Sequence, residues 1–510
     1  MDVHSEIEIK LTGDVDKLHE IIQSSKLSPF IKWSCRKNYQ TYYYDTKDNS
    51  LIKNNIVIRK RKLEENRNIL GLKWRDPGSS LFERGEIEVG IQNDKFDLRV
   101  FGEIWNQKIF QIIGNSEIEQ KFCVVVQREI YKLSSGETLI EISIDKGEIS
   151  STNKKTEIKE IELELKTGQV SILYDLAINF VEKLQLSIEL ESKAERGFLL
   201  EDKKLRKYFY KTTGISDKST DPEVFVTNSI NILVKQFAVQ IKNLSDDFYA
   251  EDIHQTRVVL RRIRVIFFAL RRISSNNDFD LLNNEARRMA ALLGKVREYD
   301  VLESLIESVP RDHINNDNGI NELILQIRME KEQSLELAKK IISEGMAAIF
   351  VIKLERLINK QGYLKSPHVK ESDNEILDIG KMSSFILTKI ERRVKKRGSK
   401  LKYLHDIGRH QLRIDLKKLR YLTDFFSPIY EKKTINDYIK HVSELQEYLG
   451  VYNDIVNAEI LLQKTSINLS HSAQFTAGKI LGWHVHANLI STKKLFKRWK
   501  KFCQASDYWS

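Results

Sequence analysis

The sequence has few of the features that mark secreted, membrane-spanning or collagen-like chains. Its three cysteines, Cys35, Cys123 and Cys503, are widely separated and form no CxxC pair, which argues against a disulfide framework and a thiolate zinc site. Six prolines and 22 glycines in 510 residues exclude collagen-like repeats. The longest apolar runs, such as residues 346–352, are far below the roughly 18 residues that cross a bilayer. We therefore expect reduced cysteines, no transmembrane helix and no membrane partner.

The N-terminal residues MDVHSEIEIK lack the basic segment and the long apolar segment of a secretory signal, so we predict a cytoplasmic protein. Hydrophobic residues make up 41% of the chain and charged residues 30%, which is enough apolar material for folded cores. The length of 510 residues exceeds one compact core and favours two to four domains.

The positive charge is unevenly distributed. Residues 1–204 contain 32 Lys and Arg against 35 Asp and Glu, a net charge of −3. Residues 205–510 carry a net charge of +14, and the sum is the +11 of the whole chain. Such asymmetry predicts that the C-terminal part meets a polyanion, whether nucleic acid, an acidic membrane surface or polyphosphate. The alternative is a solvated surface that serves solubility.

The hydrophobic period divides the chain into two parts. Up to about residue 170 charged and apolar residues alternate, as in SEIEIKL (5–11), LIEISID (139–145) and KEIELELK (159–166), which predicts antiparallel strands. Beyond residue 220 the period is 3.6, which predicts helices throughout. The expected organisation is therefore α+β and multidomain: a β domain over 1–204, a linker over 205–221 and an all-α domain over 222–505.

The predicted strands place acidic and basic side chains on one face. Glu6, Glu8 and Lys10 share a face because side chains two residues apart point the same way, and so do the three acidic residues of the segment 160–164. For a single strand, a solvated outer face is the alternative. If the strands close into a barrel with these faces inward, the charges need counter-ions. Carboxylates that hold Mg²⁺ or Mn²⁺ and cations that hold a triphosphate would together satisfy that need.

These residues resemble a known family. Glu6-Ile7-Glu8-Ile9-Lys10 is similar to the ExExK signature of the CYTH superfamily, the triphosphate tunnel metalloenzymes. The rest of the pattern follows in the order and approximate spacing of that family: Tyr43-Tyr44-Asp45-Thr46, Arg59-x-Arg61, Lys73, Arg84-x-Glu86-x-Glu88, Arg128, Asp145-x-Gly147, Glu162-x-Glu164-x-Lys166 and Ser192-Lys193-Ala194-Glu195-Arg196-Gly197. The resemblance implies an eight-stranded antiparallel tunnel that binds a triphosphate and hydrolyses it with a divalent metal.

The resemblance also implies roles for individual residues. The metal ligands would be Glu6, Glu8, Asp145, Glu162 and Glu164. The substrate would contact Lys10, Arg59, Arg61, Lys73, Arg84, Arg128 and Lys193. The residues expected to act in catalysis are Glu6, Glu8, Lys10 and Lys73.

The helical part contains an internal repeat with a shift of 156 residues. The pattern His254, Arg257, Arg261, Arg264 recurs as His410, Arg413, Lys417, Arg420, and Leu293-Gly294 recurs as Leu449-Gly450. On a helix these offsets put a histidine and three cations along one stripe. Packing histidines beside surface cations are the alternative. The two stripes resemble the CHAD domain, found beside CYTH domains, and the resemblance implies that these eight residues bind polyphosphate.

Nucleic acid is the less favoured polyanion. The repeated stripes carry no aromatic residue at the cation positions, where single-strand binders stack bases, and zinc-finger, RRM and helix-turn-helix signatures are missing.

The sequence therefore predicts metal-dependent hydrolysis of inorganic triphosphate to pyrophosphate and phosphate, with polyphosphate bound by the helical domain. Four other enzymatic activities stay open: hydrolysis of thiamine triphosphate, of nucleoside triphosphates or of RNA 5′-triphosphates, and class IV adenylate cyclase. A protein of another class, which binds polyphosphate for targeting and has no catalytic activity, is the remaining alternative.

Overall fold

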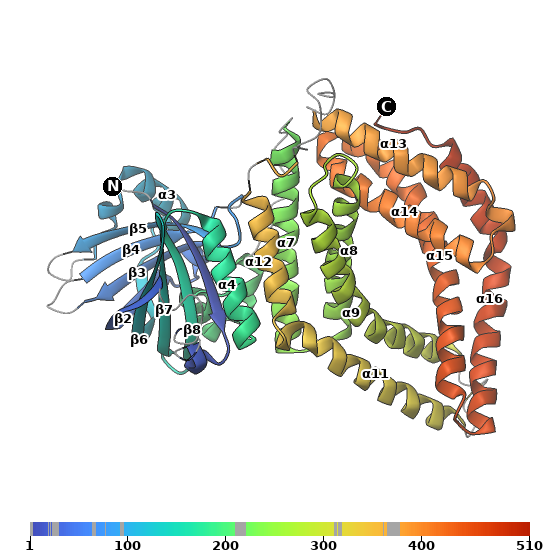
Figure 1. The fold of residues 1–510 in the computed structure, drawn as a ribbon, viewed down its shortest axis with the longest axis horizontal. Coiled ribbons are helices and arrows are strands. Elements are labelled where there is room, and N and C mark those ends of the chain that lie inside the picture. The colour runs from blue at the N-terminus through green and yellow to red at the C-terminus, as the bar shows by residue number, and fades with distance from the viewer. Residues whose placement is uncertain are drawn as a thin grey trace. The chain divides into compact units, whose positions relative to one another are not determined.

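The computed structural model describes residues 4–18, 20, 22, 30–63, 68–76, 78–91, 96–209, 221–310, 314, 319–360, 362–364 and 378–509 (Figure 1). These residues form two compact units. The first draws on 1–214, 234–242 and 340–360, and the second on 215–233, 243–339 and 361–510. Of the predicted linker 205–221, residues 210–220 lie outside the described part of the chain, and the domain boundaries stay predictions.

The first unit is built on a closed antiparallel barrel. Within the described residues, eight long strands follow the order β5-β4-β3-β2-β6-β7-β8-β1, and β1 pairs with β5 to close the ring. The strands are β1 (His4–Thr12), β2 (Ile31–Thr46), β3 (Ile56–Lys62), β4 (Asn68–Trp74), β5 (Glu83–Ile91), β6 (Ile118–Ser135), β7 (Thr138–Ser150) and β8 (Lys155–Thr167); a short β9 (Ser187–Ile188) adds to β1. The predicted eight-stranded antiparallel tunnel is confirmed.

The register places the charged faces of the strands inside the barrel. Lys10 of β1 lies opposite Glu162 of β8, and Glu8 lies opposite Glu164. The apolar residues between them point outward, where helices α3 (Glu103–Ile113), α4 (Val170–Leu184) and α5 (Lys193–Glu201) cover parts of the barrel. The usual arrangement is thus inverted: the apolar core surrounds the barrel, and its lumen is polar.

The helical part repeats itself as the sequence predicts. Helix α8 (Ala250–Leu270) maps onto α14 (Asp406–Phe426) by the same shift of 156 residues at both ends. The remaining helices pair in the same order: α7 (Pro222–Asp246) with α13 (Ile379–Gly398), α9 (Asp278–Ser308) with α15 (Lys432–Ser466), and α11 (Gly319–Ser343) with α16 (His471–Gln504). One helix, α12 (Met346–Ile358), takes no part in this pairing and lies in the first unit.

Helix α7 combines length with apolar composition. It is the one helix in the described part of the chain that would suffice by these measures to cross a membrane, although it contains no long unbroken apolar run. In the structure 56% of its most apolar window is buried. Phe225 and Phe237 are fully enclosed, so these apolar side chains contribute to protein cores.

A fully buried carboxylate fixes α12 within the first unit. The Glu355 carboxylate accepts a hydrogen bond from the backbone N–H of Leu81 at 3.1 Å. Burial raises the pKa of Glu355 to about 7, although the nearby ammonium of Lys235 opposes the shift. The folded protein therefore holds a proton on this side chain over a pH range in which the unfolded chain has released it.

Because Glu355 is protonated in the folded protein, the stability of the fold should depend on pH. Raising the pH from about 4.5 to 7 should remove up to about 3 kcal/mol from the free energy of unfolding, because the ionised form is buried. Glu355→Gln, which keeps the acceptor, should raise the calorimetric melting temperature at pH 8 and leave it unchanged at pH 5. The exposed Glu182→Gln on α4 serves as the control. Equal shifts for Glu355→Gln at both pH values would contradict the assignment.

Candidate triphosphate tunnel and a repeated cationic cavity

The barrel lumen contains a cavity of about 260 Å³, here called the tunnel cavity. All twelve residues that the sequence assigned to the metal and the substrate line it: Glu6, Glu8, Lys10, Arg59, Arg61, Lys73, Arg84, Arg128, Asp145, Glu162, Glu164 and Lys193. They come from β1, β3, β4, β5, β6, β7, β8 and the first turn of α5. Closure of the sheet brings together residues that are up to 187 positions apart in the sequence, from Glu6 to Lys193.

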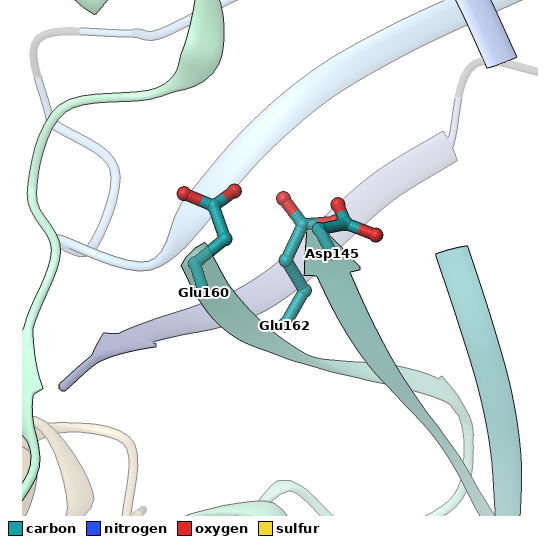
Figure 2. A group of neighbouring side chains, drawn as sticks. All are labelled: Asp145, Glu160 and Glu162. Carbon is teal, nitrogen blue, oxygen red and sulfur yellow. The ribbon is translucent and has the colours of Figure 1, made fainter. Parts of the chain in front are cut away.

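Three of the carboxylates converge beside α5. Oxygen atoms of Asp145, Glu160 and Glu162 lie within 4.8 Å of one another, and Figure 2 shows that the three side chains leave adjacent strands on the same side. The Lys193 ammonium lies 2.6 Å from Asp145 and 2.8 Å from Glu162, and it also pairs with Glu160. These acids hold the pKa of Lys193 above its ordinary value despite burial.

Two glutamates of β1 differ in their protonation. Burial raises the pKa of Glu6, but the ammonium of Lys73, 2.6 Å away, and Lys10 and Arg59 reverse this, so that the pKa falls to about 2. Glu8 pairs with Lys10, yet burial and the negative charge of Glu162 raise its pKa to about 7. Burial and the neighbouring charge of Glu162 therefore disfavour the ionised form of Glu8, whereas Glu6 stays ionised.

The arginines line the lumen on β3. Arg59 donates hydrogen bonds to Glu86 at 2.7 Å and Glu88 at 2.8 Å, and these acids keep its pKa above the ordinary value although burial opposes this. Burial and the neighbouring Arg59 lower the pKa of Arg61. The guanidinium groups of Arg61 and Arg128 lie over the ring of Tyr39, at 4.8 and 5.8 Å from its centroid.

Several lining or neighbouring residues were missing from the predicted site. Glu160 is fully buried and belongs to the carboxylate group beside α5, and the period-two pattern already placed it on the face of Glu162. Glu86 and Glu88 stand in the quoted motif and bind Arg59. The remaining lining residues are Tyr39, Thr41, Tyr43, Val57, Val124, Val126, Glu141, Lys166, Ser192 and Ala194. Among them, Tyr39 belongs to none of the motifs recognised in the sequence.

The helical repeats form a second cavity of about 230 Å³, here called the repeat cavity. It brings together His254, Arg257 and Arg261 of α8 with Arg413 and Lys417 of α14. The two predicted stripes thus face one cavity. Arg297, Glu298 and Asp454 from α9 and α15 also line it.

The cations of the repeat cavity are mutually repulsive. Burial and the charges of Arg261 and Arg413 lower the pKa of Lys417 to about 6. Burial and Arg261 lower the pKa of Arg257 to about 10. Arg257 donates to the backbone oxygen of Ala290 at 2.7 Å, across Gly294. A Cβ at Gly294 would lie 2.4 Å from the Arg257 guanidinium, which explains the repeated Leu-Gly dipeptide in this copy.

Three predicted stripe residues do not line this cavity. Arg264 and Arg420 lie further along α8 and α14, outside the lining of the repeat cavity. His410 is exposed and its Nδ1 hydrogen-bonds to the Asn453 side chain, whereas its counterpart His254 lines the cavity. The two repeats are therefore more similar in sequence than in the surroundings of their corresponding side chains.

Comparison with known proteins places these features in two families. The family model of the CYTH domain matches residues 4–198, and that of the CHAD domain matches residues 230–463. The inorganic triphosphatase of Haemophilus influenzae is 27% identical over 162 residues, which are 32% of this chain and 45% of that protein. The chain thus spans less than half the length of this relative.

Solved structures show likeness to each part of the chain. The CHAD domain of the plant Ricinus communis has a TM-score of 0.49 and 19% identity, and the match covers 57% of this chain and 94% of that one. A protein of Pyrococcus horikoshii OT3 has a TM-score of 0.26 and 21% identity, over 38% of this chain and 98% of the other. On the matches to the two family models, the chain contains a CYTH domain over residues 4–198 and a CHAD domain over residues 230–463.

Proposed function

We propose that the CYTH domain hydrolyses inorganic triphosphate to pyrophosphate and phosphate with the help of Mg²⁺ or Mn²⁺. The observation that carries the proposal is the closed tunnel cavity, in which seven predicted phosphate-binding cations and five predicted metal-binding carboxylates face one volume of about 260 Å³. The inorganic triphosphatase from Haemophilus influenzae, a relative over part of the chain, supports it.

The lining of the tunnel cavity favours an inorganic substrate over an organic one. A nucleobase or a thiazole needs an apolar or aromatic surface for stacking. The ring of Tyr39 carries two guanidinium groups, and the other tyrosine of the lining, Tyr43, stacks on Phe122 at 4.8 Å. Cations that could bind phosphate groups therefore line the cavity, whereas the rings of Tyr39 and Tyr43 are already in contact with other side chains.

In the proposed reaction the side chains of the chain position the substrate and offset its charge. Lys10, Lys73 and Arg59 now pair with carboxylates, and they would turn to phosphate oxygens when the substrate enters. Their fixed places on neighbouring strands align the phosphate groups and exclude bulk water. Carboxylates around Glu8 then orient the attacking water.

The carboxylates of the lumen fit a hard divalent cation. All the predicted ligands are carboxylate oxygens, the donors that Mg²⁺ and Mn²⁺ prefer. Burial and the negative charge of Glu162 raise the pKa of Glu8, and a cation bound beside it would favour its ionised form. Glu6, Glu8, Glu162 and Glu164, with Asp145, would hold the metal. A bound metal would neutralise phosphate charge and lower the pKa of a bound water.

Metal affinity should depend on pH through Glu8. Below its pKa of about 7 the carboxylate is protonated, and the metal must displace this proton. The apparent affinity for Mn²⁺ should therefore fall about tenfold for each pH unit below 7 and level off above it. Calorimetric titrations at several pH values test this. Glu8→Gln should bind Mn²⁺ more weakly but with a much flatter pH profile; an unchanged slope would show that another group titrates.

The substrate is tested by phosphate release. The purified protein, with Mg²⁺ or Mn²⁺, is given inorganic triphosphate, ATP, thiamine triphosphate or long-chain polyphosphate, with Glu6→Gln as the inactive control. Preferential release from inorganic triphosphate supports the proposal. Faster release from an organic triphosphate would assign the tunnel to that substrate. If none is cleaved while polyphosphate stays bound, the protein is a polyphosphate-binding targeting module.

We also propose that the CHAD domain binds inorganic polyphosphate at the repeat cavity. Five cations line it against two acids, Glu298 and Asp454, so the cations repel one another. Burial and the charges of Arg261 and Arg413 lower the pKa of Lys417 accordingly. A polyanion that bridges α8 and α14 would remove this repulsion.

A further inference from the structure

A third cavity lies near the C-terminal ends of α8 and α14, where α13 packs against them. It measures about 240 Å³ and is here called the α8–α13 cavity. Its cations are Arg272, directly after α8, and Lys389 and Arg393 of α13. Its apolar walls are Phe268, Ala269, Ile386, Ile390 and Leu422. None of the described residues that line it is acidic, in contrast to the repeat cavity, where Glu298 and Asp454 are present.

Lys418 adds a further positive charge beside this cavity. Its ammonium lies 4.0 Å from the ring centroid of Phe268, and the guanidinium of Arg272 lies 3.7 Å from the same centroid. Burial and four arginines, Arg393, Arg272, Arg264 and Arg397, lower the pKa of Lys418 to about 8. These arginines come from α8, the turn after it and α13, so the positive charge converges from several elements.

Among the described residues, an acid that contacts the arginines of this group is Asp415, and it is already engaged. Asp415 of α14 is fully buried and accepts from Arg393 Nε at 3.2 Å and from Arg397. By contrast, Arg262, the repeat counterpart of Lys418, has the carboxylate of Asp424 near it. Two cations thus share one carboxylate, and Lys418, Arg272 and Lys389 stay uncompensated by it.

The cations of α13 do not arise from the duplication. In the first repeat, the positions that correspond to Lys389 and Arg393 are Leu233 and Phe237, which are both buried apolar residues. The second repeat has therefore placed cations where the first has core residues. Lys389 and Arg393 are exposed, whereas Arg272 and Lys418 are half-buried, so an anion can enter from solvent and meet all four cations beside the apolar walls.

We propose that the α8–α13 cavity is a second anion site, which takes a phosphoryl group. None of its lining residues belongs to the histidine and cation stripes, so the inference goes beyond the proposed function. The phosphoryl group comes either from a small free phosphate compound or from a polyphosphate chain that continues from the repeat cavity. Arg261 and Arg272 are separated by about 16 Å along α8, so a single short phosphate cannot reach both.

Two matched triple variants of the full chain test the site. The cavity variant carries Arg272→Gln, Lys389→Gln and Lys418→Gln. The surface variant carries Lys381→Gln, Arg392→Gln and Lys396→Gln, which removes the same charge from exposed positions of α13. Binding of inorganic triphosphate and of long-chain polyphosphate is measured by calorimetry without metal, and melting temperatures are measured with and without ligand. The tunnel is intact in both variants and contributes equally.

The cavity variant should melt at or above the temperature of the unmodified protein when no ligand is present, because repulsion has been removed. It should nevertheless bind polyphosphate at least about tenfold more weakly, whereas the surface variant should stay within about twofold. Loss of a triphosphate site as well would identify a free small phosphate as the ligand; loss confined to long chains would identify a continuing polyphosphate.

Equal losses in the two triple variants, or no loss in the cavity variant, would overturn the second site. Two further measurements make the result independent of the proposed function. Polyphosphate binding by a separate variant, Arg257→Gln with Lys417→Gln, reports on the repeat cavity, and phosphate release by the triple variants reports on the tunnel. If the repeat cavity does not bind polyphosphate, or if the tunnel does not release phosphate, the triple variants still decide whether the second site exists.

Discussion

Glu162→Gln is expected to lower kcat for inorganic triphosphate at least about a hundredfold while the protein still binds the substrate. Glu162 contacts Lys10 at 2.7 Å and Lys193 at 2.8 Å, and also pairs with Arg128. Burial opposes ionisation, but these three cations hold its pKa well below the ordinary value. The substitution removes one negative charge from the proposed metal set and leaves the cations for phosphate.

The design separates a chemical role from a structural one. Because a negative charge disappears beside the phosphate, the affinity for triphosphate in the absence of metal should be equal or higher, while kcat and Mn²⁺ affinity fall. Glu157→Gln, at an exposed position of the same strand, is the control and should change none of these. A Glu162→Gln protein that loses triphosphate binding together with activity would indicate that Glu162 only supports the fold. Polyphosphate retention should be unaffected.

Reversal of two charges in the repeat cavity should have the opposite effect. Arg257→Glu with Arg413→Glu is expected to lower polyphosphate affinity by at least about a hundredfold, since two attractive contacts become repulsive at the point where α8 and α14 face each other. Hydrolysis of inorganic triphosphate should keep its kcat and KM. Retention on immobilised polyphosphate and phosphate release from triphosphate are measured on the same protein.

A matched reversal at exposed positions controls for net charge. Arg288→Glu with Lys440→Glu changes the charge of the chain equally, but on the exposed surfaces of α9 and α15. This protein should retain polyphosphate nearly unchanged. If both double variants lose retention alike, the overall charge binds polyphosphate and the repeat cavity has no special part. If Arg257→Glu with Arg413→Glu also abolishes hydrolysis, the proposed division of labour is wrong.

Much of the fold was predictable because the spacing of apolar residues along the sequence indicates the type of secondary structure and its buried face. Alternation in SEIEIKL and KEIELELK predicts strands with one apolar face, and the 156-residue repeat predicts the paired helices α8 and α14. The period-two pattern placed charged side chains together on one face of each strand, and the resemblance to the CYTH family singled out twelve residues among the charged ones. All twelve line the tunnel cavity once the sheet closes.

The partners within the tunnel were not predictable. Glu6 and Glu8 are equivalent in the sequence, yet Lys73 on β4 lowers the pKa of one and Glu162 on β8 raises that of the other. These shifts depend on strand order and register, which bring β4 and β8 to β1 from different parts of the chain. Tyr39 was missed because its contact with the guanidinium groups of Arg61 and Arg128 arises only across strands.

The helical part shows the same limit. The repeat predicted two equal stripes, but His410 is exposed whereas His254 lines the cavity, and Arg264 and Arg420 lie outside it. The α8–α13 cavity has no counterpart in the repeat pattern at all, since its cations on α13 replace buried apolar residues of the first copy. Packing between helices, which no single helix encodes, decides which cations meet.

By itself, therefore, the sequence determined the two kinds of secondary structure, the charged face of each strand and the duplication, because these follow from local periods along the chain. The tertiary structure alone decided which charges meet. Ion pairs and pKa values depend on distances of a few ångström between side chains that are far apart in the sequence, and those distances are set by closure of the barrel and by the packing of the helices.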